Sequence, residues 1–224
     1  MDYKAVAQEE THYDSIVYPL ALRIVAKIIA VIFHPLFIPV YVLLFTLYIS
    51  PATTGLDPDQ KFRLSISFSL MYVFFPLVTV LLAKGLGFLK SIQLKSQQDR
   101  IIPYIGCGVY FFWMWYVMHN QEGFPRPLTW FSLGVFFASS GGLTVNSFMK
   151  VSMHAIAMGV ALTFMYLSAF QSDFAFGFYV TVALLVAGVV CTARLITNDH
   201  SPREVYVGLI IGILAQLLAF LFGR

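Results

Sequence analysis

Long and nearly uninterrupted apolar runs alternate with short polar segments along this chain of 224 residues. A helix needs about 20 predominantly apolar residues to cross about 30 Å of hydrocarbon, and several of the runs reach that length. The pattern predicts seven membrane-spanning helices, at residues 30–50, 64–83, 102–118, 128–147, 154–171, 175–193 and 203–222. Because the runs are continuous, strands are not expected. We therefore predict an all-α, polytopic transmembrane bundle of six to seven spans.

The start of the chain differs from the rest. Residues 1–15 are polar and acidic, and an amphipathic stretch that carries Arg23 and Lys27 follows them. A signal peptide begins with a basic and then an apolar region, so this start does not predict one. We expect residues 1–25 to form a polar or amphipathic N-terminal segment and residues 26–224 to form one transmembrane bundle.

The composition supports a membrane location. Apolar residues make up 59% of the chain and charged residues only 11%, whereas an ordinary soluble domain has about 45–50% and about 25%. The net charge is +3, and the cations are scattered among hydrophobic segments instead of clustering on a soluble face. That distribution argues against nucleic acid as a partner and points to membrane lipids.

Three polar segments are predicted to lie on one membrane face. They follow the second, fourth and sixth predicted spans, and two successive spans return the chain to the same side. The segments are KSQQDR at 95–100, KVSMH at 150–154 and RLITNDHSPRE at 194–204. We expect the polar chemistry of this chain to converge there.

The third segment places a carboxylate four residues after a histidine. On one helix face, Glu204 can hold one nitrogen of His200 and fix the tautomer that the other nitrogen presents. A nucleophilic histidine is prepared in this way. The same residues also predict a helix start, with Ser201 as N-cap, Pro202 at the first helical position and Glu204 in a capping box. That reading leaves His200 and Arg194 unexplained.

The other two segments add a second histidine and more positive charge. Ser152 is a natural N-cap, and the free N–H groups of a helix N-terminus suit a phosphate. His154 could donate a proton to a leaving oxygen. Lys95 and Arg100, taken alone, are typical of cationic side chains that reach past a helix end towards water.

Together these groups favour phosphoryl transfer, in which cations stabilise a dianion and its transition state. A catalytic zinc site is the chemical alternative, with His154, His200 and Glu204 as ligands. The histidines do not form an H-E-x-x-H motif, and the surplus of cations disfavours a metal. We expect no metal and no other cofactor.

The three segments resemble the motifs of the type 2 phosphatidic acid phosphatase superfamily. RLITNDHSPRE is similar to its third motif, which reads Arg, five residues, His, three residues, Asp, and Glu204 takes the place of the Asp. VSMH is similar to Pro-Ser-Gly-His, with Val151 and Met153 replacing Pro and Gly. KSQQDRIIP is similar to a compressed form of the first motif, which reads Lys, six residues, Arg-Pro.

The resemblance implies a helical membrane bundle that removes phosphate from lipid phosphates without a metal. It implies that His200 is the nucleophile that forms a phosphohistidine and that Glu204 orients it. It implies that His154 protonates the leaving alcohol and later activates water. The residues that the resemblance assigns to the phosphate oxygens are Lys95, Arg100, Ser152 and Arg194.

Several functions remain open at this stage. The substrate class would be a lipid phosphomonoester or pyrophosphate in a bacterial inner membrane. A lipid phosphotransferase is one alternative, and a non-catalytic transporter or scaffold of the same fold is another. Ten of the 14 Lys and Arg residues fall on the face with the three segments and the N-terminus, which favours the cytoplasm for that face. Five of the ten lie in the candidate segments themselves, so the orientation stays open.

Overall fold

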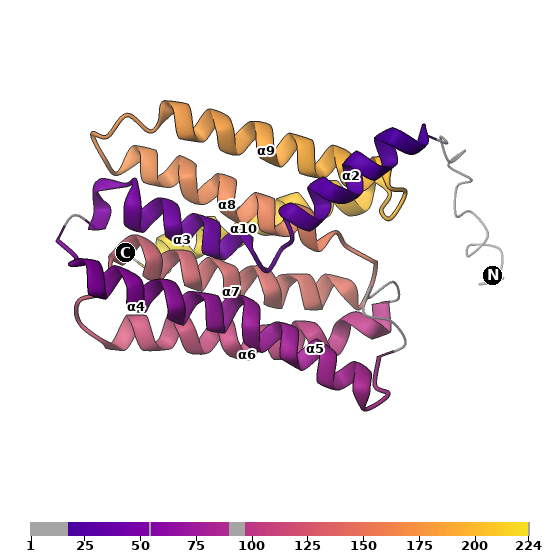
Figure 1. The fold of residues 1–224 in the computed structure, drawn as a ribbon, viewed down its shortest axis with the longest axis horizontal. Coiled ribbons are helices and arrows are strands. Elements are labelled where there is room, and N and C mark those ends of the chain that lie inside the picture. Colours follow the sequence, from indigo (N-terminus) through magenta and orange to yellow (C-terminus); the bar gives the residue numbers. More distant parts are fainter. Residues whose placement is uncertain (1–17, 54, 90–96, 224) are drawn as a thin grey trace, which may run out of the picture.

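The computed structural model describes residues 18–53, 55–89 and 97–223, and within these ranges the regular structure is helical. The expectation of an all-α fold is therefore confirmed. The helices run along a common long axis (Figure 1). They are α2 (Leu20–Ile32), α3 (Ile38–Tyr48), α4 (Pro58–Ser69), α5 (Phe75–Gly85), α6 (Gln97–Asn120), α7 (Arg126–Asn146), α8 (Met153–Phe170), α9 (Gly177–Ile196) and α10 (Pro202–Phe222).

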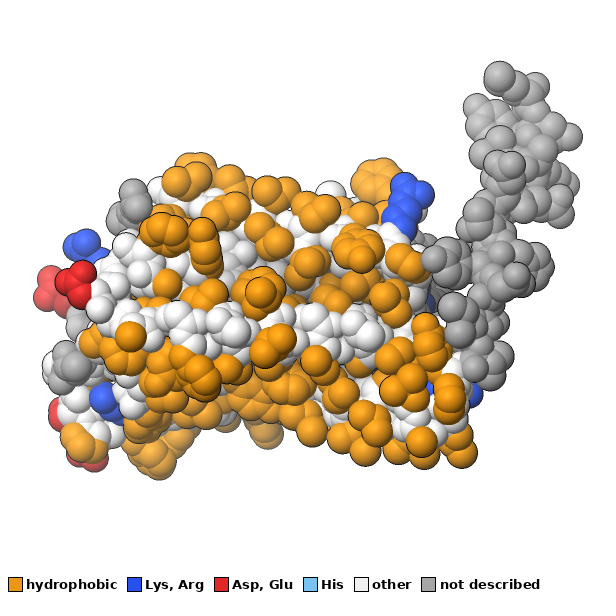
Figure 2. All heavy atoms as spheres, turned by 90° about the horizontal axis from the view of Figure 1, so that it is seen from above, with side chains coloured by type: hydrophobic (Ala, Val, Ile, Leu, Met, Phe, Trp, Pro, Cys, Tyr) orange, Lys and Arg blue, Asp and Glu red, His pale blue; other side chains and the backbone are white. Residues whose placement is uncertain are grey.

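Six helices in the described part of the chain are long and apolar enough to cross a membrane. One of them, Pro58–Gly85, consists of α4 and α5 joined by a π-helical turn at Leu70–Phe74, and the other five are α6 to α10. On the face drawn in Figure 2, charged side chains lie towards the two ends and hydrophobic side chains cover the length between them. These features define an integral membrane protein.

The prediction of a continuous membrane-spanning helix over residues 30–50 is wrong. The chain instead forms α2, a break at residues 33–37, and α3, which has only 11 residues. Pro35 explains the break, because a proline inside a helix removes a hydrogen bond and its ring clashes with the preceding turn. The expected boundary at residue 25 also falls inside α2, and α2 packs along α9 (Figure 1).

The second span is longer than predicted, and the loop before it is shorter. Helix α4 begins at Pro58, inside the segment 51–63 that the sequence predicts as a loop. The carboxylate of Asp57 accepts a hydrogen bond from the Gln60 backbone N–H at 2.7 Å, and the Gln60 side chain accepts one from the Asp57 N–H at 2.9 Å. This capping box supplies partners for the first free N–H groups of the helix.

Helices α8 and α10 touch backbone to backbone. A Cβ atom added to Gly212 would overlap the backbone oxygen of Ile156, and one added to Gly159 would overlap that of Leu209. Small residues permit such close helix contacts in membrane proteins. Nearer the site, the backbone N–H of Ser152 donates to the carbonyl oxygen of Glu204 at 3.2 Å. These contacts fix the distance between the N-termini of α8 and α10.

Candidate functional site

Segments far apart in the sequence meet at one end of the bundle, the end at which α2 and the connections α7–α8 and α9–α10 lie in Figure 1. Arg100, in the first turns of α6, donates from Nη1 to the carbonyl oxygen of Val151 at 2.7 Å. Lys150 donates from Nζ to the carbonyl oxygen of Asp199 at 2.6 Å. The shortened first span does not alter this convergence, because the later spans keep their alternating directions.

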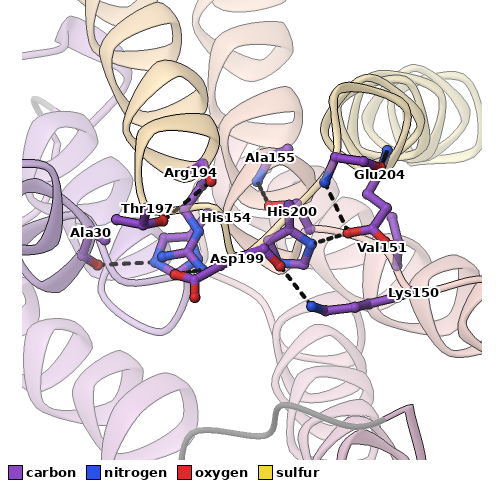
Figure 3. A network of polar contacts seen from close by, with 12 residues as sticks. Ala30, Lys150, Val151, His154, Ala155, Arg194, Thr197, Asp199, His200 and Glu204 are labelled. Carbon is purple, nitrogen blue, oxygen red and sulfur yellow. Dashed lines mark hydrogen bonds and ion pairs between the residues drawn. The ribbon is translucent and has the colours of Figure 1, made fainter. Parts of the chain in front are cut away.

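His200 and Glu204 form a close side-chain pair in the site. Nδ1 of His200 lies 2.7 Å from Oε2 of Glu204 (Figure 3). A carboxylate only accepts hydrogen bonds, so Nδ1 carries the proton and Nε2 keeps its lone pair. The predicted capping box is also present, because the Glu204 N–H donates to Ser201 Oγ at 3.3 Å and the Ser201 N–H donates to Glu204 Oε2 at 3.4 Å. Glu204 thus caps α10 and orients an imidazole at the same time.

The surroundings of His200 favour its neutral form. The residue is only 8% exposed. Burial lowers the pKa of its imidazole, and the positive charges of Lys150, Arg100 and Arg194 lower that pKa further. A neutral histidine whose Nδ1–H is held by a carboxylate presents Nε2 as a nucleophile or a base at neutral pH.

Arg194 closes α9 and pairs with the loop that follows it. Its Nη2 lies 2.8 Å from Oδ2 of Asp199, while its Nε is buried and makes no hydrogen bond to the described residues. The chain reverses at Asn198, whose φ of 54° lies in the left-handed region, a conformation that asparagine tolerates just after a helix. The turn brings Asp199 back to Arg194. Sequence reasoning did not assign Asp199 to the site, although a T-N-D turn after an apolar helix was a usable signal.

Lys150 is a second residue that the predicted site set did not include. Burial lowers the pKa of its ammonium group, and the nearby Glu204 carboxylate opposes that shift. Its position two residues before the Ser152 cap was the signal in the sequence, because such a lysine is carried to the N-terminus of the following helix. Lys150 adds a cation to the side of the site on which Glu204 lies (Figure 3).

Ser152 has the capping role that its sequence position predicts. Its Oγ accepts a hydrogen bond from the Ala155 N–H at 3.4 Å, and the residue is fully buried. The hydroxyl is therefore directed at the first turn of α8. The phosphate contact that the resemblance assigns to Ser152 stays a prediction.

His154 has a partner that the sequence did not suggest. Its Nε2 lies 3.0 Å from the carbonyl oxygen of Ala30 in α2. Its ring meets the ring of His34 edge to face, with the centroids 5.7 Å apart. The charge of His154 also acts on His200, so the two predicted histidines lie in one electrostatic environment (Figure 3).

The remaining predicted residues divide between the described and the masked parts of the chain. Arg100 is buried at 4% exposure, and Lys95 lies outside the described residues. Among residues 18–53, 55–89 and 97–223, no group of three or more His, Cys, Asp or Glu side chains is placed to hold a metal ion. No family model, no curated protein and no solved structure matches this chain.

Proposed function

We propose that this protein is a membrane-bound phosphatase of a bacterial inner membrane that hydrolyses a lipid phosphomonoester or pyrophosphate. The observation that carries the proposal is the 2.7 Å contact between His200 Nδ1 and Glu204 in a site where Arg100, Lys150 and Arg194 supply positive charge. A neutral nitrogen can attack a phosphate dianion without repelling it, and the surrounding cations stabilise the negative charge of the dianion and of its transition state. The motif resemblance to the type 2 phosphatidic acid phosphatases points to the same chemistry.

In the first step, the lone pair of His200 Nε2 attacks phosphorus, and the bond from phosphorus to the lipid oxygen breaks. The leaving oxygen takes a proton from His154 and departs as the alcohol, or as the lipid monophosphate when the substrate is a pyrophosphate. Glu204 keeps the hydrogen bond to Nδ1–H and stabilises the positive charge that develops on the ring. The product of this step is a phosphohistidine.

In the second step, water attacks the phosphohistidine and gives a proton to the now neutral His154. The phosphorus–nitrogen bond breaks, the electron pair returns to His200 Nε2, and inorganic phosphate leaves. Both histidines regain their starting protonation states, so the cycle closes without a metal.

The cations hold the phosphate oxygens in this proposal. The Nε–H of Arg194 is buried and has no hydrogen-bond partner among the residues that the structure describes, which makes it a donor for an incoming anion. We add Lys150 to the phosphate ligands that were expected from the sequence. Its ammonium group reaches the carbonyl oxygen of Asp199, in the loop that also contains His200. Lys95 and Arg100 complete the set of proposed phosphate ligands.

An apolar cavity beside the site supports a substrate with a hydrocarbon tail. It reaches from Met153, the residue before His154, into the bundle between α3, α6, α7 and α8. Its lining is mostly apolar and includes Pro103, Cys107 and Phe131. A lipid phosphate could place its headgroup among the cations and part of its tail in this cavity.

The test is phosphate release by the purified full-length protein in detergent micelles, against a panel that contains phosphatidate and an isoprenyl pyrophosphate. We expect activity in the presence of EDTA, loss of activity in His200→Ala, and an acid-labile phosphoenzyme in the wild type. His119→Ala, an exposed histidine at the other end of α6, is the matched control and should keep full activity. Inactivity of the wild type across the panel, or full activity of His200→Ala, would reject the proposal. Transfer of phosphate to an added alcohol in place of water would identify a phosphotransferase.

A further inference from the structure

The break between α2 and α3 presents free backbone carbonyls to side chains of the bundle. Carbonyl groups in the last turn of a helix have no partner within that helix. Ala30 and Ile32 lie in the last turn of α2. The carbonyl oxygen of Ala30 accepts from Nε2 of His154 at 3.0 Å, and that of Ile32 accepts from the Tyr41 hydroxyl at 2.9 Å. The end of α2 is thereby joined both to α3 and to the candidate site.

His34 adds a second contact from the same break. Its ring lies 5.7 Å from the His154 ring, measured between centroids, with an interplanar angle of 81°. Its Nδ1 accepts from the Leu36 N–H at 3.4 Å, and its ring also meets the Phe37 ring at 5.9 Å. His154 is therefore contacted by a carbonyl at one nitrogen and by an aromatic ring on another side.

We propose that the α2–α3 break is a positioning element for His154, in which the Ala30 carbonyl keeps the proton on Nε2 and the His34 ring sets the orientation of the imidazole. Nδ1 is then the nitrogen that gives a proton to the leaving oxygen and takes one from water. This inference rests on the proposed phosphatase function. His34 is a positioning residue here, since it acts through His154 and has no role in binding the substrate.

The physical basis is the same as for His200 and Glu204. The hydrogen bond at one ring nitrogen decides which tautomer the other nitrogen presents. A backbone carbonyl can serve in place of a carboxylate for this purpose. The negative end of the α2 dipole also lies at Ala30, the residue whose carbonyl oxygen contacts Nε2 of His154.

Other charged and titratable groups of the site also act on His154. They are Arg194 from α9, Asp199 and His200 from the loop before α10, and His34 from the break. The contribution of α2 therefore has to be separated from these groups by a variant in the break itself.

The position of the break supports a role towards the substrate. Pro35 and Leu36 line the same apolar cavity as Met153 and Ile156. The break thus lies between the cavity proposed for the lipid tail and the histidine proposed as the acid. A tail that fills the cavity would contact the element that holds His154.

The first experiment compares two substrates with one set of variants. A long-chain alkyl phosphate has a poor leaving group that needs a proton, whereas 4-nitrophenyl phosphate has a good leaving group that does not. General acid catalysis contributes about 10²–10⁴-fold, so the rate of the first step, measured as the pre-steady-state release of the alcohol, should fall at least about 100-fold in His154→Ala with the alkyl phosphate and little with the aryl one. The second step, in which His154 takes a proton from water, is the same for both substrates and is not part of this comparison. His34→Ala should follow the same pattern in the first step, with a loss of about tenfold in its rate and an unchanged KM. His34→Phe, which keeps a ring against His154, should restore most of the activity.

The outcomes separate the two proposals. Equal losses of the first-step rate with both substrates in His34→Ala, or no loss with either, would overturn the positioning role while the proposed function stands. A wild type that hydrolyses neither substrate would instead overturn the proposed function. As a measurement that does not depend on activity, ¹⁵N spectra of histidine-labelled wild-type protein should show the neutral His154 protonated at Nε2, with the signal assigned by its absence in His154→Gln. A proton on Nδ1 in those spectra would overturn the inference.

Discussion

The ammonium nitrogen of Lys150 lies 2.6 Å from the backbone carbonyl oxygen of Asp199, a residue 49 positions further along the chain. This hydrogen bond joins the loop before α8 to the loop before α10. The first loop leads to His154 and the second contains His200, so Lys150 connects the backbone segments that carry both histidines. A cation between two loops can also turn towards an anion, which gives the same side chain a structural and a chemical use.

Replacement of Lys150 by Gln should lower kcat/KM for a lipid phosphate by about 10²-fold, the size of the effect when one charge-stabilising donor is removed from a transition state. Phosphate release by the purified variant measures this effect. Arg126→Gln is the matched control, since Arg126 is an exposed cation at the opposite end of the bundle, and it should leave kcat/KM unchanged. Equal effects of the two substitutions would argue against a phosphate contact by Lys150.

Replacement of Glu204 by Gln separates its two roles. An amide can still complete the capping box, but it cannot stabilise a positive imidazole as a carboxylate does. We expect kcat to fall about 100-fold or more while the melting temperature in detergent changes little. Glu204→Ala removes both roles, and it should lower the free energy of unfolding by about 1 kcal/mol in addition. A fully active Glu204→Gln protein would contradict the orienting role.

The buried His200 should make stability depend on pH. Its pKa is lower in the folded protein than the ordinary value of 6.5, so below pH 6.5 the unfolded chain binds a proton that the folded protein does not. The free energy of unfolding should therefore fall as the pH falls from 6.5 towards the folded-state pKa, by up to about 1.4 kcal/mol per pH unit from this group. Thermal unfolding of wild type and His200→Gln at pH 7 and pH 5 measures the difference. The variant should lose less stability, and parallel losses would show that His200 is not the group responsible.

The contact between α8 and α10 can be tested with two glycines. Gly212→Ala places a Cβ against the backbone of α8 at Ile156 and should destabilise the protein by about 1–3 kcal/mol. Gly188→Ala in α9 has no atom within 4 Å of the added Cβ, and it should be neutral or stabilise by up to about 1 kcal/mol. Melting temperatures in the same detergent compare the two variants. Similar melting temperatures would mean that α8 and α10 are not held by backbone contact at this point.

Features that depend on near neighbours in the chain were predictable from the sequence. The S-P-R-E start of α10, the Ser152 cap of α8 and the four-residue spacing of His200 and Glu204 follow from helix geometry over a few residues. The later spans were placed within a few residues, because hydrocarbon thickness sets the length of an apolar run. Their alternating directions also predicted which loops share an end of the bundle.

The tertiary structure decided the features that join distant residues or depend on small differences in local energy. The apolar run at 30–50 predicted one span, because hydropathy reports only how apolar a segment is. It does not report that Pro35 interrupts the helix. The break then carries the Ala30 carbonyl to His154, across 124 positions. At the same end of the bundle, Lys150 reaches the Asp199 carbonyl oxygen, a contact that no spacing rule predicts. Such contacts arise from the packing of whole helices against one another, and packing is a property of surfaces that the linear order of residues does not display.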